Sequence, residues 1–135
     1  MAKSSPSPKP TAQDKEAQQR IPEGIAVSDL LRLSRQMGVS SERFERISGH
    51  SPDRLRRGRG RSEPVSPEAV GVFRGCFAVF LRAVALCGGD EKAAIQWLTA
   101  DAPALKGQKP IEAAETPEGL KAVEKLFDLL ERAGQ

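Results

Sequence analysis

Hydrophobic side chains recur at spacings of three and four residues along most of this chain, which is the periodicity of one helix face. The clearest stripe runs through Leu120, Val123, Phe127 and Leu130, after a start signal at Thr116. Aromatic residues make up only 4% of the sequence and tyrosine is absent, which is lean for a β-rich protein. The pattern predicts an all-α fold.

A second apolar helix is expected in the middle of the chain, beginning after a cap at Ser66 and ending near Leu86. Its apolar residues form two stripes, Val70, Phe73, Phe77, Phe80 and Val84, and Val72, Cys76, Val79, Ala83 and Leu86. A helix that is apolar over so much of its circumference has to be buried by other helices or by a second subunit. We expect a central core helix that also completes a homodimer interface. Its length and its two arginines argue against a membrane span.

The start of the chain contrasts with this pattern. Ser, Pro, Lys and Gln dominate the first 20 positions, which offer almost no apolar surface. Such a segment cannot offset its ordering entropy by burial. We predict a disordered basic tail over residues 1–24, with at most a short frayed helix around residues 14–20. The tail lacks the apolar core of a secretory signal, so we expect a cytoplasmic protein.

Residues 25–65 predict three short helices separated by turns. Ser28 or Asp29 is placed to cap the first helix, and Ser40 or Ser41 the second, while the third is short and basic. Two crossing helices followed by a narrow basic one are typical of a helix-turn-helix module.

Arginines crowd the end of this module. Guanidinium groups pair with phosphate and with the edge of guanine, so the cluster suits DNA. A solvated basic loop, or a dock for an acidic protein, would have the same composition. The candidate DNA-binding residues are Ser51, Arg54, Arg56, Arg57, Arg59 and Arg61. The chain carries a net charge of +3, but this charge is unevenly distributed. Positions 21–61 are net basic and positions 62–135 are net acidic, which indicates two different partner surfaces.

Nothing in the sequence indicates catalysis, a cofactor or a metal site. The chain has no glycine-rich phosphate loop and no nucleophile, base and orienting group in a plausible order. Its only histidine, His50, has no cysteine or histidine at zinc-ligand spacing. Cys76 and Cys87 are expected to stay reduced, because on one helix they would lie roughly 16 Å apart. The acids Glu112, Glu115 and Glu118 are expected to lie on solvated helix faces.

The last third of the chain carries many characteristic residues in one order. They are Gly89, Asp90, Lys92, Ala93, Trp97, Leu98, Pro103, Ala104, Leu105, Gly107, Pro110, Thr116, Glu118, Gly119, Val123, Leu126, Glu131 and Gly134. This pattern resembles the C-terminal toxin-binding domain of Xre/MbcA/ParS-type antitoxins. The chain departs from the family near position 102, where an asparagine is usual, and at Ala113 and Ala114, where a leucine pair is usual.

The resemblance implies an organisation and a partner. Residues 25–65 would be an Xre-like helix-turn-helix module, and residues 66–135 the central helix with the toxin-binding domain. Family partners are RES-domain toxins, which are similar to ADP-ribosyltransferases and consume NAD or transfer ADP-ribose to a protein. The antitoxin's C-terminal segment enters or covers the NAD pocket. We therefore expect a toxin–antitoxin hetero-oligomer, and the arginine cluster adds repression of the operon through operator DNA.

The end of the chain, judged by its residues alone, is an ordinary frayed terminus. The resemblance points instead to an inhibitory role, in which Arg132 pairs with the toxin's catalytic acid or Glu131 with its phosphate-binding basic residues. Trp97 is expected to plug a small core rather than to act as a partner hot spot. The candidate toxin-binding residues are Val123, Phe127, Asp128, Glu131, Arg132, Ala133, Gly134 and Gln135.

Two other functions fit the same residues. One is a dimeric helix-turn-helix regulator with no toxin partner, in which the C-terminal block serves only dimerisation. The other is an adaptor that binds no nucleic acid and uses the basic loop to dock an acidic protein.

Overall fold

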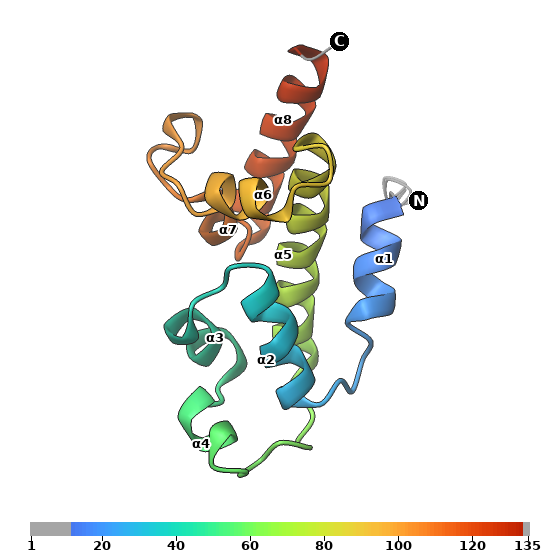
Figure 1. Ribbon diagram of the computed structural model, residues 1–135, viewed down its shortest axis with the longest axis vertical. Coiled ribbons are helices and arrows are strands. Elements are labelled where there is room, and N and C mark those ends of the chain that lie inside the picture. The colour runs from blue at the N-terminus through green and yellow to red at the C-terminus, as the bar shows by residue number, and fades with distance from the viewer. Residues whose placement is uncertain (1–11, 134–135) are drawn as a thin grey trace, which may run out of the picture.

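The computed structural model describes residues 12–133, which are mostly helical (Figure 1). In chain order the elements are α1 (Ala12–Arg20), α2 (Val27–Gln36), α3 (Ser41–Ser48), α4 (Pro52–Arg56), α5 (Pro67–Leu86), α6 (Glu91–Leu98), the 3-10 helix η1 (Pro103–Leu105), α7 (Pro110–Ala113) and α8 (Pro117–Ala133). Within the described range the only β-type pairing is an isolated bridge between Ala26 and Pro64. The predicted all-α class is confirmed.

Helix α5 is the central element, and α1, α3, α6, α7 and α8 all pack against it. Figure 1 shows α2–α4 along its first half and α6–α8 along its second half. The ring of Phe44 in α3 lies 5.5 Å from that of Phe73 in α5, measured between centroids. Buried apolar residues from both predicted modules form one cluster, so the two modules share a core.

By length and composition alone, α5 is also apolar enough to cross a membrane. A core helix passes the same test, and the helices packed on α5 bury part of its apolar surface, including Phe73, Phe77 and Phe80. Between Val70 and the end of α5, the exposed residues are Gly71, Ala85 and Leu86. The homodimer interface expected on α5 stays a prediction.

Helix starts follow their local signals. Each capping side chain accepts a hydrogen bond from the backbone N–H three residues later, at 3.0–3.3 Å. The pairs are Ser40 with Arg43, Ser66 with Ala69, Asp90 with Ala93, and Thr116 with Gly119. Prolines in the first turns of α4, α5 and α7 leave no N–H to satisfy there.

Helix α2 departs from the prediction, because neither Ser28 nor Asp29 caps it. Its N-cap residue is an alanine with no side-chain hydrogen bond. The N–H of Val27 donates instead to the carbonyl of Glu63 at 3.0 Å, and that of Ser28 to Arg61 at 3.3 Å. A returning loop therefore replaces the side-chain cap.

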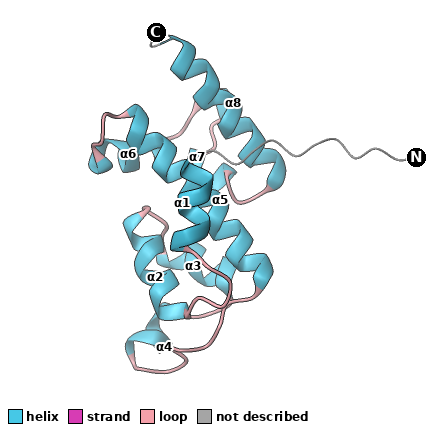
Figure 2. Ribbon diagram, turned by 90° about the vertical axis from the view of Figure 1, so that its right-hand side faces the viewer, coloured by secondary structure: helices cyan, strands magenta, loops and turns pink. Residues whose placement is uncertain are grey.

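The start of the described chain is helical over Ala12–Arg20, where the sequence allowed a short frayed helix around residues 14–20 within a disordered tail. Helix α1 lies against α5 (Figure 2). Ala17 and Ile21 are buried, and Arg74 of α5 donates from Nε to the carbonyl of Ile21 at 2.6 Å. Tertiary contacts thus order a polar segment whose own sequence favours no structure. The rest of the predicted tail that precedes α1, residues 1–11, lies outside the described residues.

Candidate functional site

Helix α8 has one face in the core and an end that projects past the rest of the described fold (Figure 1). Val123 and Phe127, two of the predicted toxin-binding residues, are fully buried in this structure. Their contact with a toxin stays a prediction. Arg132 and Ala133 are exposed at the projecting end. The remaining predicted positions, 134–135, lie outside the described residues.

A charged clamp holds α8 against α5. Arg82 donates from Nη2 to Asp128 at 2.5 Å and to Glu131 at 3.1 Å, and its guanidinium lies 5.2 Å from the ring centroid of Phe127. Burial acts to lower the pKa of Arg82, but hydrogen bonds to Glu131 and Asp128 outweigh it and raise that pKa above its ordinary value. Arg82 therefore stays charged, and two predicted toxin-binding acids are engaged within the chain. Because both acids are substantially exposed, the clamp orients α8 more than it stabilises the fold.

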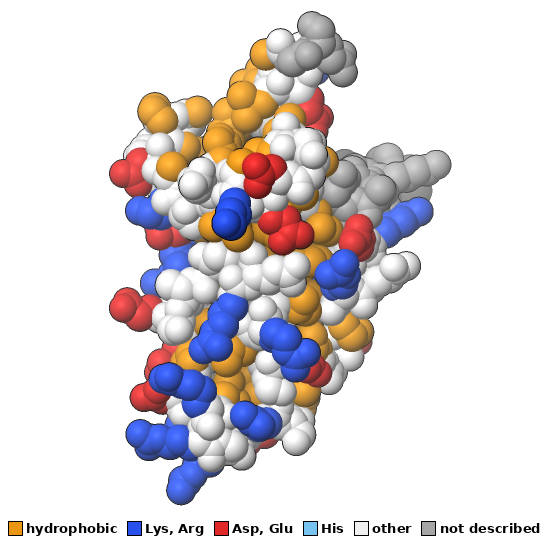
Figure 3. Space-filling model, in the orientation of Figure 1, with side chains coloured by type: hydrophobic (Ala, Val, Ile, Leu, Met, Phe, Trp, Pro, Cys, Tyr) orange, Lys and Arg blue, Asp and Glu red, His pale blue; other side chains and the backbone are white. Residues whose placement is uncertain are grey.

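An apolar groove of about 340 Å³ opens where α5, α6 and α8 meet. It is lined by Ala83, Leu86, Cys87, Trp97, Phe127 and Leu130. Figure 3 shows hydrophobic side chains gathered along α8. Leu86 is 39% exposed and Leu130 is 38% exposed.

Trp97 packs against the core, as expected, but is not fully enclosed by it. Its ring lies 5.2 Å from that of Phe127, centroid to centroid, at an interplanar angle of 37°, and it is half-buried in the wall of the groove. Sequence reasoning missed Leu86 and Leu130 as groove residues. Leu86 is the last residue of an apolar stripe on α5, and Leu130 is the last residue of the stripe on α8. The pattern within one helix does not indicate that the ends of these two stripes lie side by side.

Residues 81–131 match the family model of the antitoxin Xre/MbcA/ParS C-terminal toxin-binding domain. These 51 residues are similar to an antitoxin toxin-binding domain, and residues 81–131 are called the toxin-binding domain below. No curated protein matches the chain. The resemblance seen in the last third is confirmed, and the matched range begins earlier, within α5. All six groove residues belong to the toxin-binding domain, whereas the very end of α8 lies just beyond the matched residues.

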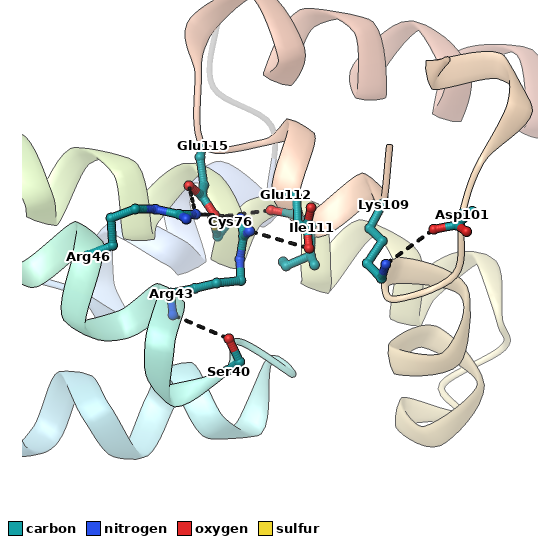
Figure 4. A network of polar contacts seen from close by, with 9 residues as sticks. All are labelled: Ser40, Arg43, Arg46, Cys76, Asp101, Lys109, Ile111, Glu112 and Glu115. Atoms are coloured by element: carbon teal, nitrogen blue, oxygen red, sulfur yellow. Dashed lines mark hydrogen bonds and ion pairs between the residues drawn. The ribbon is translucent and has the colours of Figure 1, made fainter. Parts of the chain in front are cut away.

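Ion pairs join the toxin-binding domain to α3 (Figure 4). Arg43 contacts Glu112 at 3.4 Å and also contacts Glu115, which receives Arg46 at 3.1 Å. Glu112 and Glu115 are therefore paired rather than solvated as expected, whereas Glu118 is exposed. Burial lowers the pKa of Arg43, and burial raises the pKa of the neighbouring Cys76 thiol to about 12, so that thiol is unreactive at neutral pH. This cluster is a structural joint between the modules.

A basic hollow of about 260 Å³ lies at the opposite end of the molecule from the toxin-binding domain's projecting helix. Its lining residues are Ser28, Leu31, Arg32, Arg35, Leu55, Arg56 and Arg61. Arg61 donates from Nε to the carbonyl of Leu55 at 3.0 Å and accepts from Ser28 through its own carbonyl. The loop thereby reaches the arginines of α2, and Figure 3 shows Lys and Arg side chains gathered over this end.

Only two of the predicted DNA-binding residues, Arg56 and Arg61, line the hollow. All five predicted arginines are exposed, and Ser51 is half-buried at the N-cap of α4 without a side-chain cap bond. Arg56 also pairs with Asp53. Helix α4 has five residues, a little over one turn. Sequence reasoning missed Arg32 and Arg35, because they precede the cluster by some 20 positions.

No group of three His, Cys, Asp or Glu side chains within the described part of the chain is placed to hold a metal ion. The chemistry available at both surfaces is recognition by charge and apolar contact.

Proposed function

We propose that this chain is the antitoxin of a type II toxin–antitoxin system and neutralises a RES-domain toxin by covering its NAD-binding site with the end of α8. The matched toxin-binding domain supports a toxin as partner. The observation that carries the mode of inhibition is the projecting, exposed end of α8. Binding and occlusion need no chemistry from the antitoxin, which agrees with a non-enzymatic role. A toxin that consumes NAD acts in the cytoplasm, where the antitoxin is also expected.

Arg132 is better placed than Glu131 to enter an NAD pocket. Glu131 is engaged by Arg82 through two hydrogen bonds. Arg132 pairs with no acid in the described range and stands in the last turn of α8, where the helix dipole favours a cation. The preceding clamp holds the helix axis in place. A guanidinium on this rigid end is suited to pair with a catalytic carboxylate in the toxin.

Ending the chain after Glu131 tests this assignment, because the cut keeps the Arg82 clamp and the buried face of α8. We expect toxin binding to persist, stability to change by less than about 0.5 kcal/mol, and protection to be lost. The measurement is growth and cellular NAD during co-expression with the cognate RES-domain toxin. Arg132→Ala should reproduce much of the loss.

The matched control is Lys125→Ala, which removes an exposed cation from the same helix away from its end. This variant should protect like the full-length chain. If the shortened chain also protected fully, inhibition would not come from the end of α8.

We further propose that the basic face of α2 and α4 binds operator DNA and lets the antitoxin repress its own operon. The support is the convergence of two arginines from α2 with two from the later cluster around one hollow. Four guanidinium groups at one face suit consecutive phosphates of a DNA backbone. The expected homodimer would present two such faces, as a palindromic operator requires.

Replacing Arg32 and Arg35 together by alanine should weaken operator binding and flatten its salt dependence. Each phosphate contact contributes about 0.9 to the slope of log affinity against log salt, so the slope should fall by nearly 2. Fluorescence anisotropy at several salt concentrations measures it, with Lys121→Ala and Lys125→Ala on α8 as the charge-matched control. An unchanged slope would contradict DNA binding at this face and favour the adaptor.

The other alternative predicts different partners. A dimeric regulator with no toxin partner would bind a palindrome with strong salt dependence, yet would not bind a RES-domain protein. Co-purification of the chain with that protein as a hetero-oligomer separates the two functions.

A further inference from the structure

The groove between α5, α6 and α8 is an apolar surface with no covering element in the described chain. Three large apolar side chains in residues 12–133 are exposed, and two of them, Leu86 and Leu130, line this groove. Single exposed apolar residues are ordinary in folded proteins. Here they converge beside a tryptophan, the residue type most enriched among interface hot spots.

The walls of the groove are held in place before any partner arrives. The Trp97 and Phe127 rings pack together, and Arg82 fixes α8 to α5 through Asp128 and Glu131. A preformed surface loses little conformational freedom on binding, which favours affinity. The volume of about 340 Å³ lies at the small end of ligand pockets, and the groove is open to solvent, so it suits protruding side chains.

The end of α8 is too small to hold a toxin alone. A stable protein–protein interface buries about 800 Å² on each partner, which a single exposed helical turn cannot provide. Further contact area must lie next to the end of the helix. Leu130, which lines one side of the groove, directly precedes Glu131 in α8. All of the lining residues fall within the matched range.

We infer that the groove is the anchoring site for the toxin and receives one or two bulky apolar side chains from it, separately from the inhibitory end of α8. This inference rests on the proposed function. Affinity then comes mainly from the groove, whereas inhibition comes from the residues beyond Glu131. A second copy of this chain is a less suitable occupant, because it would also cover the end of α8 that has to reach the toxin.

Leu86→Asp tests the anchor, because Leu86 lies on α5, away from the end of α8, and is exposed enough for the substitution to leave the core intact. Burying a charge in place of a hot spot should weaken binding to the purified RES-domain protein by at least about 30-fold in calorimetry. Leu130→Asp should act similarly. The matched control is Leu129→Asp, the neighbouring residue, which is 61% exposed and outside the groove. It should bind within about threefold of the original chain.

The outcomes separate the anchor from the proposed function. Equal affinities for the Leu86→Asp, Leu129→Asp and original chains would overturn the anchor while leaving inhibition by the end of α8 intact. Loss of a homodimer in Leu86→Asp, seen by light scattering, would assign the groove to a second copy and also overturn the anchor. Failure of the original chain to bind the RES-domain protein at all would overturn the proposed function, and the anchor with it.

Discussion

Replacing Gly119 by alanine is expected to lower the free energy of unfolding by about 3 kcal/mol. A β-carbon at this position would lie 1.9 Å from the carbonyl oxygen of Ala113 and 2.9 Å from Oγ1 of Thr116. The first contact is with backbone, so the tight connection between α7 and α8 has to move. That movement also disturbs the Thr116 cap, which accepts from the Gly119 N–H at 3.0 Å. The gain in helix propensity, about 1 kcal/mol, is too small to compensate.

The matched control is Gly71→Ala in α5, where an added β-carbon meets no atom within 4 Å. Helix propensity acts alone there, and stability should rise by about 0.5–1 kcal/mol. Urea unfolding followed by circular dichroism measures both variants. A Gly119→Ala variant as stable as the original chain would contradict the close approach of α8 to the end of α7.

Phe127→Ala should lower the free energy of unfolding by about 4 kcal/mol, within the range of 3–5 kcal/mol typical of a buried phenylalanine. Phe127 is fully buried, packs its ring against Trp97 and lies under the guanidinium of Arg82. Because Trp97 is the only tryptophan, its fluorescence reports the local change. Its emission should shift to longer wavelength as the groove wall opens to water.

Leu129→Ala is the control on the same helix and should change stability by less than about 0.5 kcal/mol, because Leu129 is largely exposed. The Phe127→Leu variant distinguishes a role of Phe127 in stabilising the fold from a direct contact with the toxin. It keeps most of the buried volume, so it should lose less than about 1.5 kcal/mol and still bind the toxin. A folded Phe127→Leu variant that no longer bound the toxin would restore Phe127 as a direct contact.

Helix starts were predictable because their causes are local. Ser66, Asp90 and Thr116 each bond to a backbone N–H three residues later, so the signal and its effect lie in one short stretch. The cap of α2 was not predictable, because the carbonyls that replace it come from a loop more than 30 residues downstream. The packing of α1 on the core was not predictable for a similar reason, although a short helix around residues 14–20 was allowed for. Its order depends on burial of Ala17 and Ile21 against the core.

At the two candidate surfaces, too, local features could be predicted from the sequence, whereas contacts between distant segments could not. The arginine cluster is contiguous and therefore visible in the sequence, but its junction with Arg32 and Arg35 depends on how the loop returns to α2. Phe127 was correctly placed on an apolar stripe, yet its assignment to the toxin interface did not anticipate full burial. A helical stripe identifies a face that is covered, and does not distinguish covering by the chain itself from covering by a partner.

By itself, the sequence determined the all-α class, most helix starts and the similarity of residues 81–131 to an antitoxin toxin-binding domain, because capping, periodicity and residue order are all properties of neighbouring positions. Only the tertiary structure decided which apolar residues stay exposed and that Leu86 and Leu130 share one groove. It also decided that Glu131 is paired with Arg82, whereas Arg132 pairs with no acid among residues 12–133. Those features arise from contacts between helices distant in sequence, and packing geometry sets them.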